Sequence, residues 1–427
     1  MAHHAYPALL TKPNYFGTLA AARDLGKREI KVFTVGSGKG KPTSLSKYVS
    51  EHYSCSSENN PDALIEWLLR YGEQHPNTVL YPTCDDTAWL HSIHAAALAR
   101  HFCMYSPGAD AIKNVLDKRR LFDACLQVGI DVPNTHFAEA EADVLQVAQQ
   151  ANFPLLLKQR TQVFSATRTK GALIVDPDKL ADAYREFMKR NPHEPNVLKH
   201  MPYASWPLLQ DYYADTGNYL VAGFVNRDHT EIVALASVKL LQYPRSLGIA
   251  LCLERSPLKE ETVEKLLALC KQTGYYGVFQ VEYLVSNGRM MLNDFNPRFY
   301  HYMEFDIARG LPLPWLAYLG SIGEEKHLAQ EIAHARANLD RDGHDTFTCR
   351  SKLFEMIWAQ RLTGTMTHRD FKSWQQWYRH NKSNMVFALA DAEDNQPEVG
   401  AVMDTILEHL RHPRAFIRKI ALDRILF

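Results

Sequence analysis

Four polar side chains near the middle of the chain have the types and spacing of a phosphate-handling site. They are Glu282, Asp294, Asn296 and Arg298. The first lies in one short β-like run and the others end the next run, with the turn Ser286-Asn287-Gly288 between the two. If the runs pair as neighbouring strands, three oxygen side chains and a guanidinium converge on one point. Such oxygens suit Mg²⁺, which usually arrives with nucleotide phosphates, and the arginine suits a second phosphate or a carboxylate. A salt-bridged hairpin without a ligand is the alternative.

Three lysines lie in or next to predicted strands and helices, where a positive charge could serve to bind an anion. Lys158 closes an apolar run and is costly to bury without an anion. Lys118 begins a predicted helix, and Lys239 lies in a mostly apolar predicted strand. Taken singly, each also fits an ordinary lysine that faces water.

The segment 210–213 is a candidate for nucleotide recognition. It ends a predicted strand before the polar turn 214–217, so its backbone groups would be free to read a purine edge. The residues concerned are Gln210, Asp211, Tyr212 and Tyr213, with Asp211, Asp215 or Asn218 available to a ribose hydroxyl. A strand followed by a polar turn of no special function is the alternative.

The composition is that of an ordinary globular protein with room for two or three domains in 427 residues. Lys plus Arg and Asp plus Glu number 48 each, so net charge gives no argument for nucleic-acid binding. The seven cysteines form no CxxC pair, which is typical of reduced intracellular thiols. The N-terminus lacks the features of a signal peptide, and no apolar run is long enough to span a membrane. We therefore expect a cytoplasmic protein.

The hydrophobic pattern changes twice along the chain and predicts three parts. Residues 1–112 alternate apolar runs with helical patterns, which indicates a Rossmann-like α/β domain with a parallel, doubly wound sheet. Residues 113–324 are richer in predicted strands. Residues 325–427 read as a C-terminal extension that is mainly helical.

In order and spacing, these features resemble the ATP-grasp superfamily, especially carboxylate-amine ligases similar to the large subunit of carbamoyl phosphate synthase. The resemblance covers roughly residues 5–320. The matching segments are Val79-Leu-Tyr-Pro-Thr-Cys-Asp-Asp86, Leu116-Asp-Lys118 through Gly129-Ile-Asp-Val-Pro133, Phe153-Pro-Leu-Leu-Leu-Lys158, Leu209-Gln-Asp-Tyr-Tyr213, and Glu282 with Asn293-Asp-Phe-Asn-Pro-Arg298. Each motif is weak alone, and the ordered set is fairly specific.

The resemblance implies an α+β, two-lobed ATP-grasp domain over 113–324, with a hinged lid lobe at about 120–225. It implies that Lys118 and Lys158 hold ATP phosphates and that Gln210 to Tyr213 line the adenine site, with Asp211 and Asn218 close by. It also implies that Lys239 approaches the γ-phosphate and that Arg298 stabilises an acyl phosphate. By the same comparison, Glu282, Asp294 and Asn296 would hold one or two Mg²⁺ or Mn²⁺ ions.

Two departures from the family pattern stand out. Asp294 occupies a position where glutamate is usual. Its side chain is shorter by one methylene, so the distance from the backbone to a bound metal would differ. The loop 160–171 has one glycine where the family loop is glycine-rich, and Arg160, Arg168 and Lys170 are the side chains that would replace backbone contacts to phosphate.

The predicted function is ATP-dependent ligation of a carboxylate to an amine through an acyl phosphate. One alternative is an ATP-grasp enzyme that uses bicarbonate, a thiol or a hydroxyl group as acceptor, and another is a nucleotide-binding module without catalysis. The basic run 411–427 fits a helix docked on the protein's own core better than one on a membrane surface. Small-molecule carboxylate and amine substrates are the expected partners, nucleic acid is not, and a homodimer is left open.

Overall fold

The computed structural model describes residues 6–37, 41–55, 59–165, 171–214, 216–243 and 249–411. Its N-terminal part is a parallel five-stranded sheet in the order β3-β2-β1-β4-β5, as the strand-helix alternation predicts. The strands are β1 (Ala8–Thr11), β2 (Val32–Gly36), β3 (Val49–Ser54), β4 (Thr78–Leu80) and β5 (Phe102–Cys103). The intervening helices are α1 (Phe16–Lys27), η2 (Thr43–Leu45), α2 (Pro61–Gln74), α3 (Asp85–Ile93) and α4 (Ala95–Leu98). The strand order reverses between β1 and β4. In open α/β sheets, ligands bind in the crevice beyond the carboxyl ends of the strands at such a reversal.

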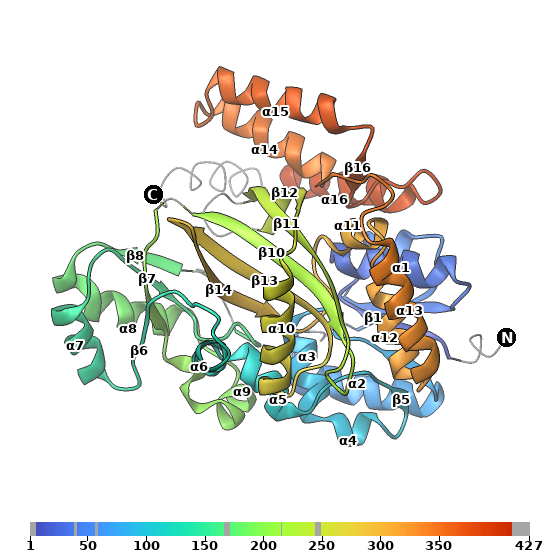
Figure 1. Cartoon of the computed structure of the whole chain (residues 1–427), viewed down its shortest axis with the longest axis horizontal. Coiled ribbons are helices and arrows are strands. Elements are labelled where there is room, and N and C mark those ends of the chain that lie inside the picture. The colour runs from blue at the N-terminus through green and yellow to red at the C-terminus, as the bar shows by residue number, and fades with distance from the viewer. Residues whose placement is uncertain are drawn as a thin grey trace.

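A seven-stranded sheet forms the centre of the molecule, in the order β14-β13-β10-β11-β12-β15-β16 (Figure 1). Its strands are β10 (Gly217–Val225), β11 (Ile232–Tyr243), β12 (Ile249–Ser256), β13 (Gly277–Ser286), β14 (Arg289–Asn296), β15 (Thr346–Thr348) and β16 (Met385–Phe387). Helices α5 (Ala109–Leu116), α6 (Lys118–Gln127) and α10 (Glu260–Thr273) pack against it. Neighbouring strands are antiparallel except the last pair.

A smaller lobe is built on a four-stranded antiparallel sheet in the order β6-β9-β7-β8. The strands are β6 (Thr135–Phe137), β7 (Leu155–Lys158), β8 (Gly171–Ile174) and β9 (Leu208–Asp211). Its helices are α7 (Glu141–Gln150), η3 (Pro177–Lys179) and α8 (Leu180–Arg190). Before β9, α9 (Pro195–His200) and η4 (Pro202–Ser205) add Val197 and Ala204 to the core shared with the N-terminal part. The lobe has an apolar core of its own, which includes Val144, Leu157 and Tyr184.

The boundaries of this lobe differ from the range of about 120–225 that the sequence suggests. Helix α6 contributes Leu121 and Phe122 to the core shared with the N-terminal part, and β10 belongs to the large sheet. The lobe with its own core therefore begins near β6 and ends at β9. A pattern of apolar residues cannot show which of two sheets a strand joins, because that depends on long-range pairing.

The C-terminal extension is mainly helical, and it also adds two strands to the large sheet. Its helices are α13 (Glu325–Asn338), α14 (Arg350–Leu362), α15 (His368–Asn381) and α16 (Gln396–Arg411). Two helices, α11 (Met303–Ala308) and α12 (Leu313–Ser321), connect β14 to it. Asp394 accepts hydrogen bonds from Arg23 Nε at 2.9 Å and Ser46 Oγ at 2.7 Å, and it is buried. This ion pair joins the extension to the N-terminal part.

Of the basic run 411–427, all but Arg411 lies outside the described residues, so its predicted docking is not addressed. Among the helices that the structure describes, none combines the length and apolar character needed to cross a membrane.

Candidate active site

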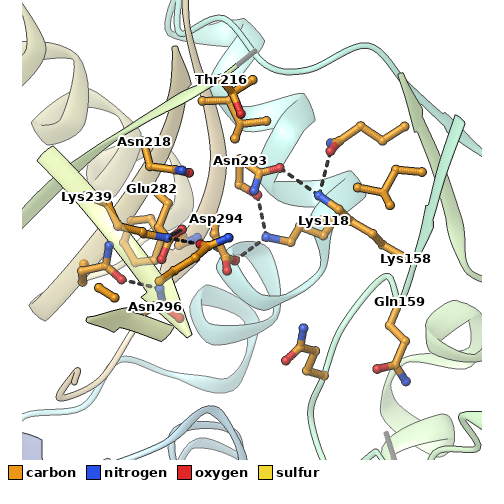
Figure 2. A pocket seen from close by; sticks show the side chains of 18 of the residues that line it. Lys118, Lys158, Gln159, Thr216, Asn218, Lys239, Glu282, Asn293, Asp294 and Asn296 are labelled. Carbon is orange, nitrogen blue, oxygen red and sulfur yellow. Dashed lines mark hydrogen bonds and ion pairs between the residues drawn. The ribbon is translucent and has the colours of Figure 1, made fainter. Parts of the chain in front are cut away.

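A cavity of about 520 Å³ opens between the small lobe and the large sheet, and Figure 2 shows its side chains. Twelve of the residues singled out in the sequence line it: Lys118, Lys158, Gln210, Asp211, Tyr212, Tyr213, Asn218, Lys239, Glu282, Asp294, Asn296 and Arg298. They come from both sheets and from the start of α6. Residues separated by up to 180 positions in sequence are thus gathered in one place.

The hairpin predicted from the turn at 286–288 forms as β13 and β14. Glu282 pairs directly with Asp294, and Gln280 pairs with Asn296. The register shifts after Glu282, so that Asn293 falls at the irregularity. Such a bulge redirects side chains, and here both Asn293 and Asp294 line the cavity.

Lys118 is bound to the bulged segment of β14. Its Nζ donates to the carbonyl oxygen of Asn293 at 2.6 Å and to the Asp294 carboxylate. Burial alone would raise the pKa of Asp294, but the charge and hydrogen bond of Lys118, with Arg298 and Lys158 nearby, hold it below its usual value. Asp294 is therefore an anion at neutral pH.

Lys239 is paired with Glu282, as Lys118 is with Asp294. Its Nζ lies 3.1 Å from Glu282 Oε2 and 3.4 Å from Gln242 Oε1. The Lys239 side chain is only 5% exposed, whereas that of Glu282 is 28% exposed and faces the cavity. The alternative that Lys239 is an ordinary lysine facing water is wrong, because its side chain is almost fully buried.

Lys158 differs because its contacts are to amide oxygens. Its Nζ lies 2.8 Å from Gln210 Oε1 and 3.5 Å from Asn293 Oδ1. Burial, reinforced by the positive charge of Lys118, lowers the pKa of Lys158 to about 8. A buried ammonium beside another lysine, with neutral hydrogen-bond partners, is arranged to receive an anion.

Arg298 is held at the edge of the cavity by three acceptors. Nε donates to Asp85 Oδ1 at 2.9 Å, Nη2 to Asn296 Oδ1 at 2.6 Å, and Nη1 to the Phe299 carbonyl at 3.2 Å. The side-chain oxygen of Asn296 is thus already engaged, so Asn296 can serve a metal only if it also leaves or shares this contact. The guanidinium is fixed in place before any ligand arrives.

The 210–213 segment, at the end of β9 in the small lobe, also lines the cavity. Asp211 Oδ2 accepts from Asn134 Nδ2 at 2.9 Å, while Asp211 Oδ1 is buried and has no partner within the described residues. Such an unpaired buried acceptor is unfavourable unless a ligand donates to it. Asn218 lines the cavity too, on β10 opposite Lys239. Asp215, the other ribose candidate, lies outside the described residues.

The donor set suits a metal that is bound together with phosphates. Within the described ranges, no cluster of three or more His, Cys, Asp or Glu side chains could by itself hold an ion. Glu282 and Asp294 nevertheless lie directly opposite each other, with Asn296 on the same strand as Asp294. Mg²⁺ is commonly held by one or two carboxylates plus substrate phosphate oxygens rather than by an all-protein cage. The residues present therefore fit Mg²⁺ that arrives with a nucleotide.

The suggestion that Arg160 covers the phosphates is wrong. Its Nε lies 3.0 Å from both oxygens of Asp117, and its Nη1 lies 3.0 Å from Glu139 Oε1. The side chain is buried in this network and packs the small lobe against α6 instead. Arg168 and Lys170 lie outside the described residues.

Sequence reasoning missed several cavity residues, among them Asp85, Gln280 and Asn293. Asp85 lies in the motif that resembles the last strand of the family's first domain, but nothing in that motif shows contact with a residue 213 positions away. Gln280 could have been found, because it lies two residues before Glu282 and so faces the same side of the strand.

No family model matches the chain. It is similar to the carbamoyl phosphate synthase large chain of Myxococcus xanthus (strain DK1622), with 22% identity over 217 residues. That match covers 50% of this chain and 19% of the relative, so it concerns only a small part of the larger protein.

Solved structures resemble the chain over most of its length. A biotin carboxylase in complex with β,γ-ATP from Campylobacter jejuni has a TM-score of 0.56 and 16% identity, covering 78% of this chain and 73% of its own. The biotin carboxylase domain dimer of 2-oxoglutarate carboxylase from Hydrogenobacter thermophilus, with MgADP, ADP and bicarbonate, has a TM-score of 0.57 and 14% identity, covering 74% and 70%. An N5-carboxyaminoimidazole synthetase from Staphylococcus aureus complexed with ADP has a TM-score of 0.55 and 13% identity, covering 74% and 77%. These proteins share one architecture with the chain, and the chain has the ATP-grasp fold.

Proposed function

We propose that the protein is an ATP- and Mg²⁺-dependent ligase that activates a carboxylate as an acyl phosphate and transfers it to an amine, with release of ADP and phosphate. The observation that carries this proposal is the cavity in which three lysines and one arginine surround two facing carboxylates. Phosphoryl transfer requires positioned reactants and concentrated positive charge rather than covalent help from the protein.

Each cation has a distinct place in this reaction. Mg²⁺ bound with ATP would supply charge neutralisation at the phosphate oxygens, with Glu282, Asp294 and Asn296 as its protein ligands. Lys118 and Lys158 would then release their present partners and bind phosphate oxygens. Lys239, held beside Glu282, would lie next to the phosphoryl group in transfer.

Arg298 would bind the activated acid. It is already oriented by Asp85 and Asn296 and still has guanidinium protons that these contacts leave free. A prearranged guanidinium stabilises the developing charge without reorganising during the reaction. The small lobe, which carries Lys158 and the 210–213 segment, would close over the nucleotide and keep water from the acyl phosphate.

Support for an ATP-dependent activity also comes from the resembling structures, whose bound ligands are named as β,γ-ATP, MgADP and ADP. The bicarbonate in one of them makes bicarbonate a candidate acid for this chain as well. A nucleotide-binding module without catalysis remains the contrasting candidate, and it has no need for two opposed carboxylates beside three lysines.

The test is ADP release from Mg²⁺-ATP in the presence of defined pools. One pool holds the twenty proteinogenic amino acids with C2–C6 dicarboxylates, a second holds bicarbonate, and hydroxylamine serves as a trap for acyl phosphates. The ligase proposal predicts acid-dependent ADP release together with hydroxamate from at least one pool. Tight ATP binding with no turnover in any pool would support the non-catalytic module instead.

A further inference from the structure

A buried arginine at the C-terminal end of α11 joins two segments that line the cavity. Arg309 is 1% exposed, and all five of its N–H groups donate hydrogen bonds. Two groups donate to Asp340, Nε at 2.6 Å and Nη2 at 3.1 Å, and Nη1 donates to Asp306 Oδ1 at 3.3 Å. The other bonds reach β11, from Nη1 to Ser237 Oγ at 3.0 Å and from Nη2 to the Ala236 carbonyl at 3.1 Å. These contacts fix the guanidinium in one orientation.

On the β11 side, Arg309 binds the strand two and three residues before Lys239. Because side chains alternate along a strand, Ser237 and Lys239 project from the same face. The pairing of β11 with β12 becomes irregular directly after Lys239, and such an irregularity changes the direction of nearby side chains. Arg309 therefore anchors the strand just before the place where its regular pairing ends.

On the other side, Asp306 ties the network to the segment that follows β14. Its Oδ2 accepts a hydrogen bond from the Tyr300 hydroxyl at 2.6 Å, and Tyr300 lines the cavity two residues after Arg298. Asp306 is 1% exposed, and burial raises its pKa to about 6, so the carboxyl is mainly ionised at neutral pH. The network therefore runs from the cavity wall that carries Arg298 to the strand that carries Lys239.

The outermost member of the network, Asp340, belongs to the C-terminal extension. It follows α13 by two residues, its side chain is 33% exposed, and its backbone N–H donates to the Arg309 carbonyl at 2.9 Å. Gly310 lets the two segments meet, because a Cβ there would lie 3.0 Å from the Asn338 carbonyl oxygen. After desolvation, a buried ion pair adds little to stability, so the geometry that it fixes is the more informative property. The extension thereby reaches a network that ends in the cavity wall.

We propose that Arg309, clamped by Asp340 of the C-terminal extension, is a positioning residue that sets the separation of Lys239 and Arg298 across the cavity. The inference rests on the proposed ligase function, in which these two cations act on the transferred phosphoryl group and on the activated acid. A displacement of about 1 Å in either one lowers the rate of the chemical step up to about 100-fold without removing a group that binds ATP. The extension thus completes the active site, although none of its described residues lines the cavity.

The test uses Asp340→Ala, which removes the outer clamp at a partly exposed position, and Tyr300→Phe, which removes one hydroxyl group. Each variant should lower kcat for acid-dependent ADP release about tenfold. KM for ATP should change less than about twofold, because Lys118, Lys158 and the 210–213 segment lie on other elements. A purely structural role would lower the melting temperature and leave kcat of the folded enzyme unchanged.

The double variant tests whether the two residues act through the same arginine. Effects of residues in one network are not additive, so the double variant should lose about 10- to 30-fold in kcat rather than about 100-fold. Glu231→Gln is the matched control, because Glu231 pairs with Arg336 of α13 at exposed positions. Arg336 also donates to the Ile232 carbonyl at 3.1 Å, at the start of β11. This variant removes another link between α13 and β11 and should change kcat less than about twofold.

The outcomes separate this inference from the ligase proposal. Unchanged kcat in folded Asp340→Ala, or losses that multiply to about 100-fold in the double variant, would overturn the positioning role and leave the ligase proposal intact. If wild-type protein releases no ADP with any pool, the ligase proposal fails, and amide hydrogen exchange decides whether the clamp anchors β11. Exchange in residues 236–243 should be faster in Asp340→Ala than in wild type or Glu231→Gln, and equal exchange would contradict the anchor. Should Asp340→Ala not fold, Asp340→Asn, which keeps one acceptor oxygen for Arg309, takes its place.

Discussion

Asp294→Asn should lower ADP release about 1,000-fold, equivalent to about 4 kcal/mol of transition-state stabilisation. Asp294 is the anion that faces Glu282 across β13 and β14 and that Lys118 contacts in the absence of ligand. Asparagine keeps the shape and one oxygen but loses the charge that would hold Mg²⁺ against the phosphates. The loss should appear in kcat, measured with saturating Mg²⁺-ATP and the productive acid pool.

A matched control separates this effect from damage to the hairpin. Arg289 lies on β14, as Asp294 does, and forms an ion pair of 3.3 Å with Asp131 on the exposed surface. Asp131→Asn should change kcat less than twofold, since exposed ion pairs contribute little. Near wild-type turnover in Asp294→Asn would refute the metal assignment, while unfolding of Asp294→Asn, detected by circular dichroism, would show a structural role.

Lys158→Met should weaken productive ATP use, lowering kcat/KM for ATP about 100-fold. The methionine fills similar space next to Gln210 but carries no charge for phosphate. Lys158→Arg keeps the charge and should retain much more activity. If Lys158→Met and Lys158→Arg lost activity equally, the shape of the site rather than its charge would be responsible.

The same lysine predicts a pH dependence of nucleotide binding. The pKa of Lys158 is about 8 without ligand, and a bound phosphate favours the charged form and raises it. The affinity for a non-hydrolysable ATP analogue should therefore fall by about fivefold between pH 8 and 9, as the neutral amine becomes dominant. Calorimetric titration should show proton uptake on binding in this range. Lys158→Arg should lose this dependence, and an identical profile in both proteins would contradict the role of Lys158.

The sequence was informative about the site because its residues lie at the ends of strands or in alternation along them. The order of Lys118, Lys158, Gln210, Glu282 and Asp294 could be read directly, and the structure brings them into one cavity. The hairpin was predictable since Asn287-Gly288 is a strong turn signal between two apolar runs.

Other features depend on contacts that a linear pattern does not contain. Strand β3 has the polar sequence Val-Ser-Glu-His-Tyr-Ser and an exposed edge position, so it gives no apolar signal. The sequence suggested that Arg160 contacts phosphate, whereas its actual partners are Asp117 and Glu139. Both lie far from Arg160 along the chain, so a local pattern could not reveal these ion pairs. The irregularity at Asn293 depends on how β14 pairs with β13, which residue types alone do not reveal.

The most direct test of the central claim follows an oxygen atom. The productive acid pool is labelled with ¹⁸O in its carboxyl groups, and the inorganic phosphate released with ADP is examined by mass spectrometry. An acyl phosphate mechanism predicts that a carboxyl oxygen is transferred, so that each phosphate formed carries one ¹⁸O from a labelled acid. Unlabelled phosphate, released at the same rate as ADP, would show that water attacks ATP and would contradict carboxylate activation.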